Sequence, residues 1–415
     1  MKILIDHGTP DARNFGDLAM IQALVHTLRK AEPDCELGLL AQTPSAFPEH
    51  VGEEITIYNT ETYWPLKNFP VAPLRLPSWL RHMIYLWSRG SVQRQCRLRS
   101  SARRRRCRPS VQQLMHDEGF DGLAIAGGSV ISHTFLGFTE LLFNELLAAH
   151  RQGLATAIFG AGIGPVDHAL LLQWCRQVVP ELTYLGSREC AQYQEMLDGM
   201  KAGSFGEVTG DLALAHPKLT GQPAKAQPLG DLIGINVRAT YYSKIEGSAA
   251  DDLGQALRSV ADRTGMKPCL IPINRHAEEG DHRSVGRLMG WPKNADGLLG
   301  LVSTVDDLLD RIKHCRLVIS GSYHACVFAL ALGVPCVAVI ASDYYQHKMV
   351  GLFEMFGLQP STVDMRQADF VQRLHQEVDR YQTVNDKQRQ GWIERAREQA
   401  ELVEAGVRRF VGAST

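Results

Sequence analysis

The chain has 415 residues, of which 45% are hydrophobic and 21% are charged, and its formal net charge is −1. This is the composition of a soluble globular protein with room for two domains of ordinary size, and the charge balance argues against a nucleic-acid partner. Apolar runs are too short for a membrane-spanning helix, the N-terminus lacks the pattern of a signal peptide, and the nine cysteines have no Cys-x-x-Cys spacing. We therefore expect a cytoplasmic protein with reduced thiols and no metal centre.

The first half of the chain alternates short apolar runs with glycine-containing turns and helical patterns, which is typical of a parallel α/β sheet. Expected strands are 2–6, 36–41, 55–59, 122–126, 155–159 and 182–185, and expected helices cover about 18–30 and 139–151. Turns with candidate ligand-binding residues follow three of these strands. They contain Asp17, Gly127-Gly128-Ser129 and the glycines at 160, 162 and 164. Glycine lets a backbone approach a ligand closely, whereas Asp17 is equally well explained as a helix N-cap.

Residues 60–110 interrupt this pattern. A proline- and aromatic-rich stretch is followed, between positions 75 and 108, by eleven arginines without an acidic residue. Aromatic side chains next to a cationic run favour contact with an anionic membrane surface through 75–108. A loop near an anionic substrate and a solvated segment without a specific role are the alternatives.

The segment 217–230 contains proline, glycine and lysine without apolar periodicity, and we interpret it as a linker. It separates an N-terminal domain, 1–216, from a second domain, 231–355, which is followed by a helical tail, 356–415. In the second domain we expect strands at 232–238 and 269–273 and helices at 249–264 and 308–315. Arg238 ends the first of these strands, where ligands of open α/β sheets bind.

The strongest candidate site lies between positions 316 and 351. An apolar run ends at the turn Ser320-Gly321-Ser322, a helix is expected from Tyr323, and a further strand covers 336–341. Such a turn presents free N–H groups and the positive end of a helix dipole to an anion. His324 falls in the first helical turn and Lys348 follows the next strand, so an imidazole and an ammonium converge there. A packed His324 and a solvent-exposed Lys348 are the plainer explanations.

Several short motifs between about residues 13 and 355 resemble, in order and spacing, those of the polysaccharide pyruvyl transferase family. They are Asn14-x-Gly16-Asp17, Gly127-Gly128-Ser129, Gly160-Ala161-Gly162, Ser187-Arg188-Glu189, Gly210-Asp211, Val237-Arg238 and the block from Ser320 to Gly351. The resemblance implies two Rossmann-like parallel-sheet domains facing across a cleft, as in GT-B glycosyltransferases. It also implies a transferase that moves the carboxyvinyl group of phosphoenolpyruvate to a sugar and forms a pyruvate ketal.

The resemblance implies His324 as the acid/base group, Arg238 for the carboxylate or phosphate, and Lys348 as a second cation. The implied substrate-binding set is Asn14, Gly16, Asp17, Gly127, Gly128, Ser129, Gly162, Arg188, Ser320, Gly321, Ser322, Tyr323 and Lys348. Many family members carry Arg-Leu-His where this chain has Ser-Tyr-His, which is similar to a sister branch. Arg275 and Lys244 are candidates to supply the replaced charge.

The implied reaction needs no cofactor, because phosphoenolpyruvate itself is the donor substrate. The implied acceptor is a saccharide or lipid-linked saccharide of a surface glycan, met in the cytoplasm or at the inner face of the plasma membrane. Two other functions fit the same sequence. One is a glycosyltransferase that binds the diphosphate of a nucleotide sugar at 320–322, and the other is a non-catalytic module that binds glycan or a partner.

Overall fold

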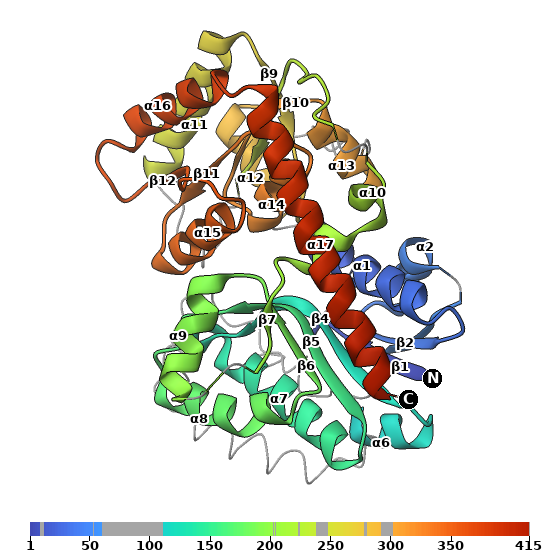
Figure 1. Ribbon diagram of the computed structural model, residues 1–415. Coiled ribbons are helices and arrows are strands. Elements are labelled where there is room, and N and C mark those ends of the chain that lie inside the picture. Colours follow the sequence, from blue (N-terminus) through green and yellow to red (C-terminus); the bar gives the residue numbers. More distant parts are fainter. Residues whose placement is uncertain are drawn as a thin grey trace, which may run out of the picture.

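The computed structural model describes residues 1–8, 12–52, 54–59, 111–201, 203, 205–222, 225–237, 248–277, 280–291 and 302–414. The predicted segment 60–110 and the candidates Arg238 and Lys244 lie outside these ranges. The described part has two α/β units, one above the other, with one long helix running along both (Figure 1). No helix among the described residues has the length and apolar character needed to cross a membrane.

The first unit is built on a seven-stranded parallel sheet with the strand order β3-β2-β1-β4-β5-β6-β7. Its strands are β1 (Lys2–Asp6), β2 (Glu36–Ala41), β3 (Thr56–Asn59), β4 (Gly122–Ile131), β5 (Ala155–Ile163), β6 (Tyr184–Ser187) and β7 (Glu207–Val208). The central strands β1, β4 and β5 are buried along nearly their whole length, as expected for a parallel sheet covered on both faces.

Helices cover both faces of this sheet (Figure 1). Their bounds are α1 (Phe15–Ala31), α2 (Pro48–Val51), α6 (Val111–Asp117), α7 (Leu136–Arg151), α8 (Ala169–Val178), α9 (Cys190–Met200) and α10 (Pro217–Thr220), with short 3₁₀ turns η1 (Pro44–Ala46), η2 (His133–Phe135), η3 (Val179–Glu181) and η4 (Leu212–Ala215). The apolar residues of α6 to α9 form one core layer with the sheet. Those of α1 and η4 belong to a second layer, which continues into the other unit.

The second unit has a five-stranded parallel sheet in the order β12-β11-β10-β8-β9. Its strands are β8 (Leu232–Asn236), β9 (Lys267–Leu270), β10 (Cys315–Ser320), β11 (Cys336–Ile340) and β12 (Thr362–Asp364), and its helices are α11 (Ser248–Thr264), α12 (Asp281–Met289), α13 (Val305–Lys313), α14 (Tyr323–Ala331), α15 (Asp343–Met355) and α16 (Phe370–Gln382). The expected α/β fold with two parallel-sheet domains is confirmed.

The last helix, α17 (Asp386–Ser414), is 29 residues long and packs on both units. Near its start, Arg389 Nε donates a hydrogen bond to the Gly333 carbonyl of the second unit at 2.7 Å. Near its end, the Phe410 ring meets the Phe159 ring of β5 at a centroid distance of 5.7 Å. The helix therefore joins the two units along one edge.

The segment 217–230, expected to be a linker, begins with the short helix α10. Two expectations about local structure were wrong. The second sheet does not end before 356, because β12 pairs with β11. The glycine stretches at 127–128 and 160–162 are parts of β4 and β5 rather than turns after them. Gly127 and Gly160 have positive φ there, and a Cβ would lie 2.4 Å from the Met20 sulfur and 2.7 Å from the Leu212 nitrogen, so these glycines permit close packing.

Candidate active site

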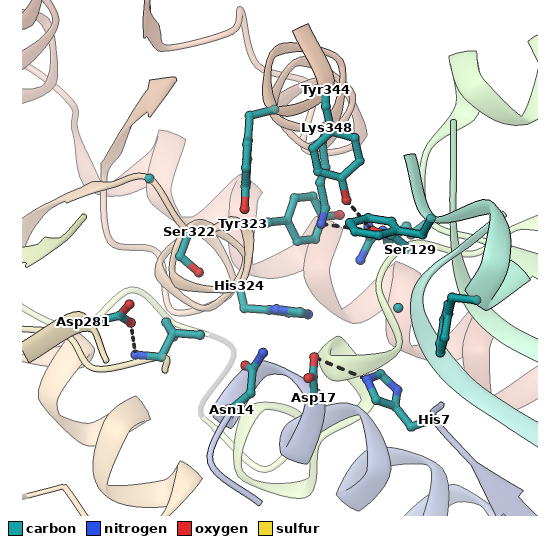
Figure 2. A pocket seen from close by; sticks show the side chains of 17 residues that line it. His7, Asn14, Asp17, Ser129, Asp281, Ser322, Tyr323, His324, Tyr344 and Lys348 are labelled. Carbon is teal, nitrogen blue, oxygen red and sulfur yellow. Dashed lines mark hydrogen bonds and ion pairs between the residues drawn. The ribbon is translucent and has the colours of Figure 1, made fainter. Parts of the chain in front are cut away.

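A cavity of about 480 Å³ lies between the carboxyl ends of the two sheets (Figure 2). Both units contribute to its wall. The lining residues are His7, Asn14, Asp17, Gly128, Ser129, Phe135, Phe138, Arg188, Ile273, Asp281, Gly321, Ser322, Tyr323, His324, Tyr344, Tyr345 and Lys348. This is the position at which parallel α/β sheets usually bind ligands, and the volume is that of a small-molecule site. Most of the residues singled out in the sequence are brought together here.

The N-terminus of α14 faces this cavity. Strand β10 ends at Ser320, whose hydroxyl oxygen accepts a hydrogen bond from the Ser322 N–H at 2.8 Å and so shapes the turn. Ser322 is the N-cap residue, yet its side chain makes no capping hydrogen bond to the helix. The first N–H groups of an α-helix have no partner within the helix. The first turn of α14 can therefore offer backbone donors and a positive dipole to an anion.

His324 lies in that first turn and projects into the space between the units (Figure 2). It is 8% exposed, and its Nε2 has no hydrogen-bond partner among the described residues, the nearest carboxylate oxygen being Asp211 Oδ2 at 3.8 Å. Burial lowers the pKa of His324 to about 4, although Asp211 and Asp17 act in the opposite direction. The ring is therefore neutral at pH 7, and a neutral imidazole has a nitrogen that can accept a proton.

Arg188 is 2% exposed and holds its charge inside a dense network. Its Nε donates to Glu189 at 2.8 Å and its Nη1 to Asp211 at 3.3 Å. Its guanidinium carbon lies 4.3 Å from the centre of the Tyr323 ring. Burial alone would lower the pKa of Arg188, but the neighbouring carboxylates raise it. Because two carboxylates already balance this cation, Arg188 organises the cavity wall more than it supplies net positive charge.

Lys348 supplies a cation that is not directly ion-paired among the described residues. It extends from α15 toward the cavity, and its Nζ donates to Ser129 Oγ at 3.3 Å and lies 4.8 Å from the Tyr323 ring centre (Figure 2). Burial, followed by repulsion from Arg188, lowers the pKa of Lys348 to about 7. The ammonium thus stands in the cavity wall, not on an open surface.

Ser129 connects these groups. Its hydroxyl lies 3.4 Å from Arg188 Nη2, 3.3 Å from Lys348 Nζ and 2.7 Å from the Tyr344 hydroxyl. Arginine and a protonated lysine can only donate, so the Ser129 hydrogen is directed to Tyr344. One small side chain thereby fixes groups from both units across the cavity.

His7 and Asp17 form a pair on the opposite wall (Figure 2). His7 is 7% exposed, its Nε2 lies 3.3 Å from Asp17 Oδ1, and its Nδ1 donates to the Ala126 carbonyl. Burial alone would lower the pKa of His7, but Asp17, the Ala126 carbonyl and Asp6 together outweigh it, so the pKa of His7 is raised. His7 was not among the residues expected from the sequence, although it directly follows β1 and the strand-end rule applies to it. Nor were the lining residues Phe135, Phe138, Tyr344 and Asp281.

Four of the proposed substrate-binding residues do not line the cavity: Gly16, Gly127, Gly162 and Ser320. A Cβ on Gly16 would lie 2.1 Å from His324 Nδ1, and one on Gly162 would lie 2.3 Å from Arg188 Nη2. Gly16 and Gly162 therefore make room for site side chains. Asn14 lines the cavity and is also the N-cap of α1, a role expected for Asp17, which lies in the first turn.

Arg275 does not supply a charge to the cavity wall. Its Nη1 donates to the Ser303 carbonyl at 3.2 Å, and its guanidinium lies 5.1 Å from the Phe15 ring centre. Within the described ranges, no group of three or more His, Cys, Asp and Glu side chains has the arrangement of a metal site.

Comparison with known proteins gives both a family and a fold. The family model described as polysaccharide pyruvyl transferase matches residues 14–344. No curated protein sequence matches the chain.

The structural relatives are nucleotide-sugar enzymes at low sequence identity. UDP-GlcNAc 2-epimerase from Neisseria meningitidis, solved with UDP-GlcNAc, has a TM-score of 0.54 and 12% identity, and the match covers 96% of this chain and 98% of that one. UDP-N-acetylglucosamine 2-epimerase from Rickettsia bellii has a TM-score of 0.55 and 13% identity, with 99% and 96% covered. A ugt transferase from Siraitia grosvenorii in complex with UDP has a TM-score of 0.51 and 10% identity, and both chains are covered fully. At these identities the likeness establishes the GT-B fold.

Proposed function

The chain belongs to the polysaccharide pyruvyl transferase family, and on that premise we propose that its cavity binds phosphoenolpyruvate and transfers the carboxyvinyl group to a saccharide. The observation that carries this proposal is the meeting of the uncapped α14 N-terminus, Lys348 and the neutral His324 in one cavity between the units. The first two groups are suited to bind the anionic donor, and His324 is suited to take up a proton.

The first requirement of the reaction is to hold a phosphate and a carboxylate. Backbone donors at the start of α14 and the Lys348 ammonium are suited to these anionic groups. Because the pKa of Lys348 is lowered to about 7 by burial and by Arg188, the free site loses its positive charge as the pH rises through 7. Donor affinity should therefore weaken on the alkaline side of neutrality.

The second requirement is to remove a proton from the attacking sugar hydroxyl. The buried His324 Nε2 has no hydrogen-bond partner in the described structure, and the ring is neutral at pH 7. In the proposed step, C3 of phosphoenolpyruvate gains a proton through the electrons of the C2–C3 double bond, and the hydroxyl oxygen bonds to C2 while its own proton passes to His324. A second hydroxyl then displaces phosphate and closes the ketal.

The third requirement is to bind a saccharide. The ring of Phe135 is 36% exposed and meets Tyr344 edge to face at 5.9 Å, and both residues line the cavity. Aromatic faces are suited to the C–H groups of a sugar, and the Tyr344 hydroxyl to its oxygens. We propose a saccharide or lipid-linked saccharide acceptor at the cytoplasmic face of the membrane. Contact of residues 75–108 with anionic lipid is part of this proposal, and salt-sensitive co-sedimentation with phosphatidylserine vesicles tests it.

A nucleotide-sugar glycosyltransferase is the second candidate, because two of the structural relatives named above were solved with UDP-GlcNAc or UDP. Thermal unfolding with phosphoenolpyruvate or UDP separates the two. A ligand at a hundredfold excess over its dissociation constant adds about 2.7 kcal/mol of stability. We expect phosphoenolpyruvate, and not UDP, to raise the melting temperature.

The matched variants are Lys348→Met and Lys267→Met. Lys267 pairs with Asp231 on the surface, with 76% of its side chain exposed, outside the cavity. Lys348→Met should lose most of the stabilisation by phosphoenolpyruvate, and Lys267→Met should keep it. Stabilisation by UDP alone would refute the proposal in favour of nucleotide-sugar chemistry.

A further inference from the structure

The His7–Asp17 pair has a proton count that the contacts alone determine. A backbone carbonyl can only accept, so the hydrogen bond between His7 Nδ1 and the Ala126 carbonyl requires a proton on Nδ1. Nε2 then faces Asp17 Oδ1 at 3.3 Å. An ionised carboxylate can only accept too, so this contact is favourable only with a second proton between the two atoms. The pair therefore stores one proton in the cavity wall.

The surrounding structure holds the pair in place. His7 follows β1 and is 7% exposed, and a Cβ on Gly128 would come within 3.2 Å of its ring. Asp17 lies in the first turn of α1, with 31% of its side chain exposed. In Figure 2, Asp17 lies between His7 and His324, on the side of the cavity away from Lys348. The rigid, buried member of the pair is thus His7, and the accessible member is Asp17.

The proposed function leaves one proton transfer unassigned. Phosphoenolpyruvate becomes reactive at C2 only when its methylene carbon, C3, gains a proton. His324 is neutral at pH 7 and suited to accept. Lys348 donates to Ser129 Oγ of the first unit and is assigned to the anionic groups of the donor. Asp17 lines the same cavity, on the wall that holds the His7–Asp17 pair.

Resting on the proposed function, we propose that Asp17 and His7 form the proton-donating dyad of this site. Asp17 delivers the proton to C3 of the donor, and His7, oriented by the Ala126 carbonyl, is the positioning residue that keeps Asp17 supplied with that proton.

The step balances without a further reactant. The π electrons of the C2–C3 double bond form the new C3–H bond with the proton that passes from His7 through Asp17. C2 becomes an oxocarbenium carbon, and the first sugar hydroxyl attacks it while His324 takes the hydroxyl proton. When the second hydroxyl bonds to C2, the bond from C2 to the phosphate oxygen breaks, and phosphate leaves with its electron pair. Of the two hydroxyl protons, one replaces the proton that the dyad gave to C3, and the other passes to phosphate or solvent.

The first experiment measures the protonation state of His7 in the absence of substrate. Nitrogen-15 NMR of the full chain should show His7 protonated on both ring nitrogens at pH 7, with a midpoint above the ordinary histidine value. The charged groups facing His7 are Asp17 from α1 and Asp6 from β1, so Asp17→Asn should lower this midpoint. A neutral His7 at pH 7 in the unaltered protein would overturn the proposal.

The second experiment measures phosphate release from phosphoenolpyruvate with a panel of p-nitrophenyl hexosides as acceptors. Asp17→Asn and His7→Gln should lower kcat by roughly 10²- to 10⁴-fold, the range for loss of a general acid. The shift in melting temperature caused by phosphoenolpyruvate should remain, and the solvent deuterium isotope effect on kcat should rise. Asp17→Glu, which can still carry a proton, should recover part of kcat. The matched control is His150→Gln, because His150 forms a surface pair with Glu181 at 2.9 Å outside the cavity.

The outcomes separate this inference from the function on which it rests. An unaltered protein without phosphoenolpyruvate binding or turnover would overturn both. Normal turnover in folded Asp17→Asn would overturn the dyad alone. So would a lost kcat with a raised isotope effect in Lys348→Met but not in the dyad variants, since the donor would then be Lys348. If the buried His7→Gln variant fails to fold, the Asp17→Asn variant alone still tests the dyad.

Discussion

Gly16→Ala tests how tightly the site holds His324. Gly16 is the second residue of α1, and its Cα faces the imidazole of α14 across the seam between the units. A Cβ added there would lie 2.1 Å from His324 Nδ1 and 2.4 Å from Cγ. Both atoms belong to a ring that is 8% exposed and packed beside Phe328, so the ring cannot simply swing into solvent.

The size of the effect follows from these distances. Real Cβ atoms essentially never approach another heavy atom closer than 3.0 Å, so ring and helix must separate by about 1 Å. A displacement of that size at a reacting group lowers turnover on the order of 10²-fold. Overpacking of this kind also destabilises a protein by about 1–3 kcal/mol. In an open helical position, by contrast, glycine to alanine stabilises by roughly 0.5–1 kcal/mol.

The assay combines urea unfolding with phosphate release from phosphoenolpyruvate. Gly391→Ala is the matched control, because Gly391 lies within α17 and an added Cβ there would meet nothing within 4 Å. We expect opposite signs of the stability change in the two variants and a loss of kcat only in Gly16→Ala. A folded Gly16→Ala protein with unchanged kcat would refute the assignment of His324 to proton transfer.

Two further predictions concern buried charge. Arg188→Met leaves Glu189 and Asp211 without their cation, and loss of one partner of a buried ion pair destabilises by about 3–5 kcal/mol; urea unfolding measures this, and an unchanged midpoint would contradict the network. His324 and His216 both have a pKa lowered to about 4 by burial. The unfolded chain therefore binds more protons below pH 6.5, and stability should fall between pH 6.5 and 4 by up to roughly 3 kcal/mol per histidine. A double His→Gln variant should flatten that part of the pH curve, and a curve that keeps its slope would refute the attribution.

The sheets could be predicted because their strands are buried on both faces and therefore appear as continuous apolar runs, as in 36–41 and 336–340. Strand β12 could not, since it has only three residues and one of them, Val363, is buried. The rule that ligands bind at the carboxyl ends of strands located the cavity, and with it His324 and Lys348. The same rule applies to His7, but His7 was not selected because it belongs to none of the recognised motifs.

The roles within the site were harder to predict than its position. A glycine in a sequence signals close approach but does not reveal what approaches, so Gly16 and Gly162 were assigned to substrate although they accommodate His324 and Arg188. An arginine likewise signals charge without showing its partners. Glu189 follows Arg188 directly, but Asp211 is distant in sequence and becomes its partner only through the packing of the first unit.

The packing of α17 on both units limits how the cavity can open. Arg389 anchors this helix on the second unit and Phe410 anchors it on the first, so α17 ties the two units together along one edge. We therefore expect any widening of the cavity to be smallest along this edge and largest on the side away from α17, where substrates would enter and leave.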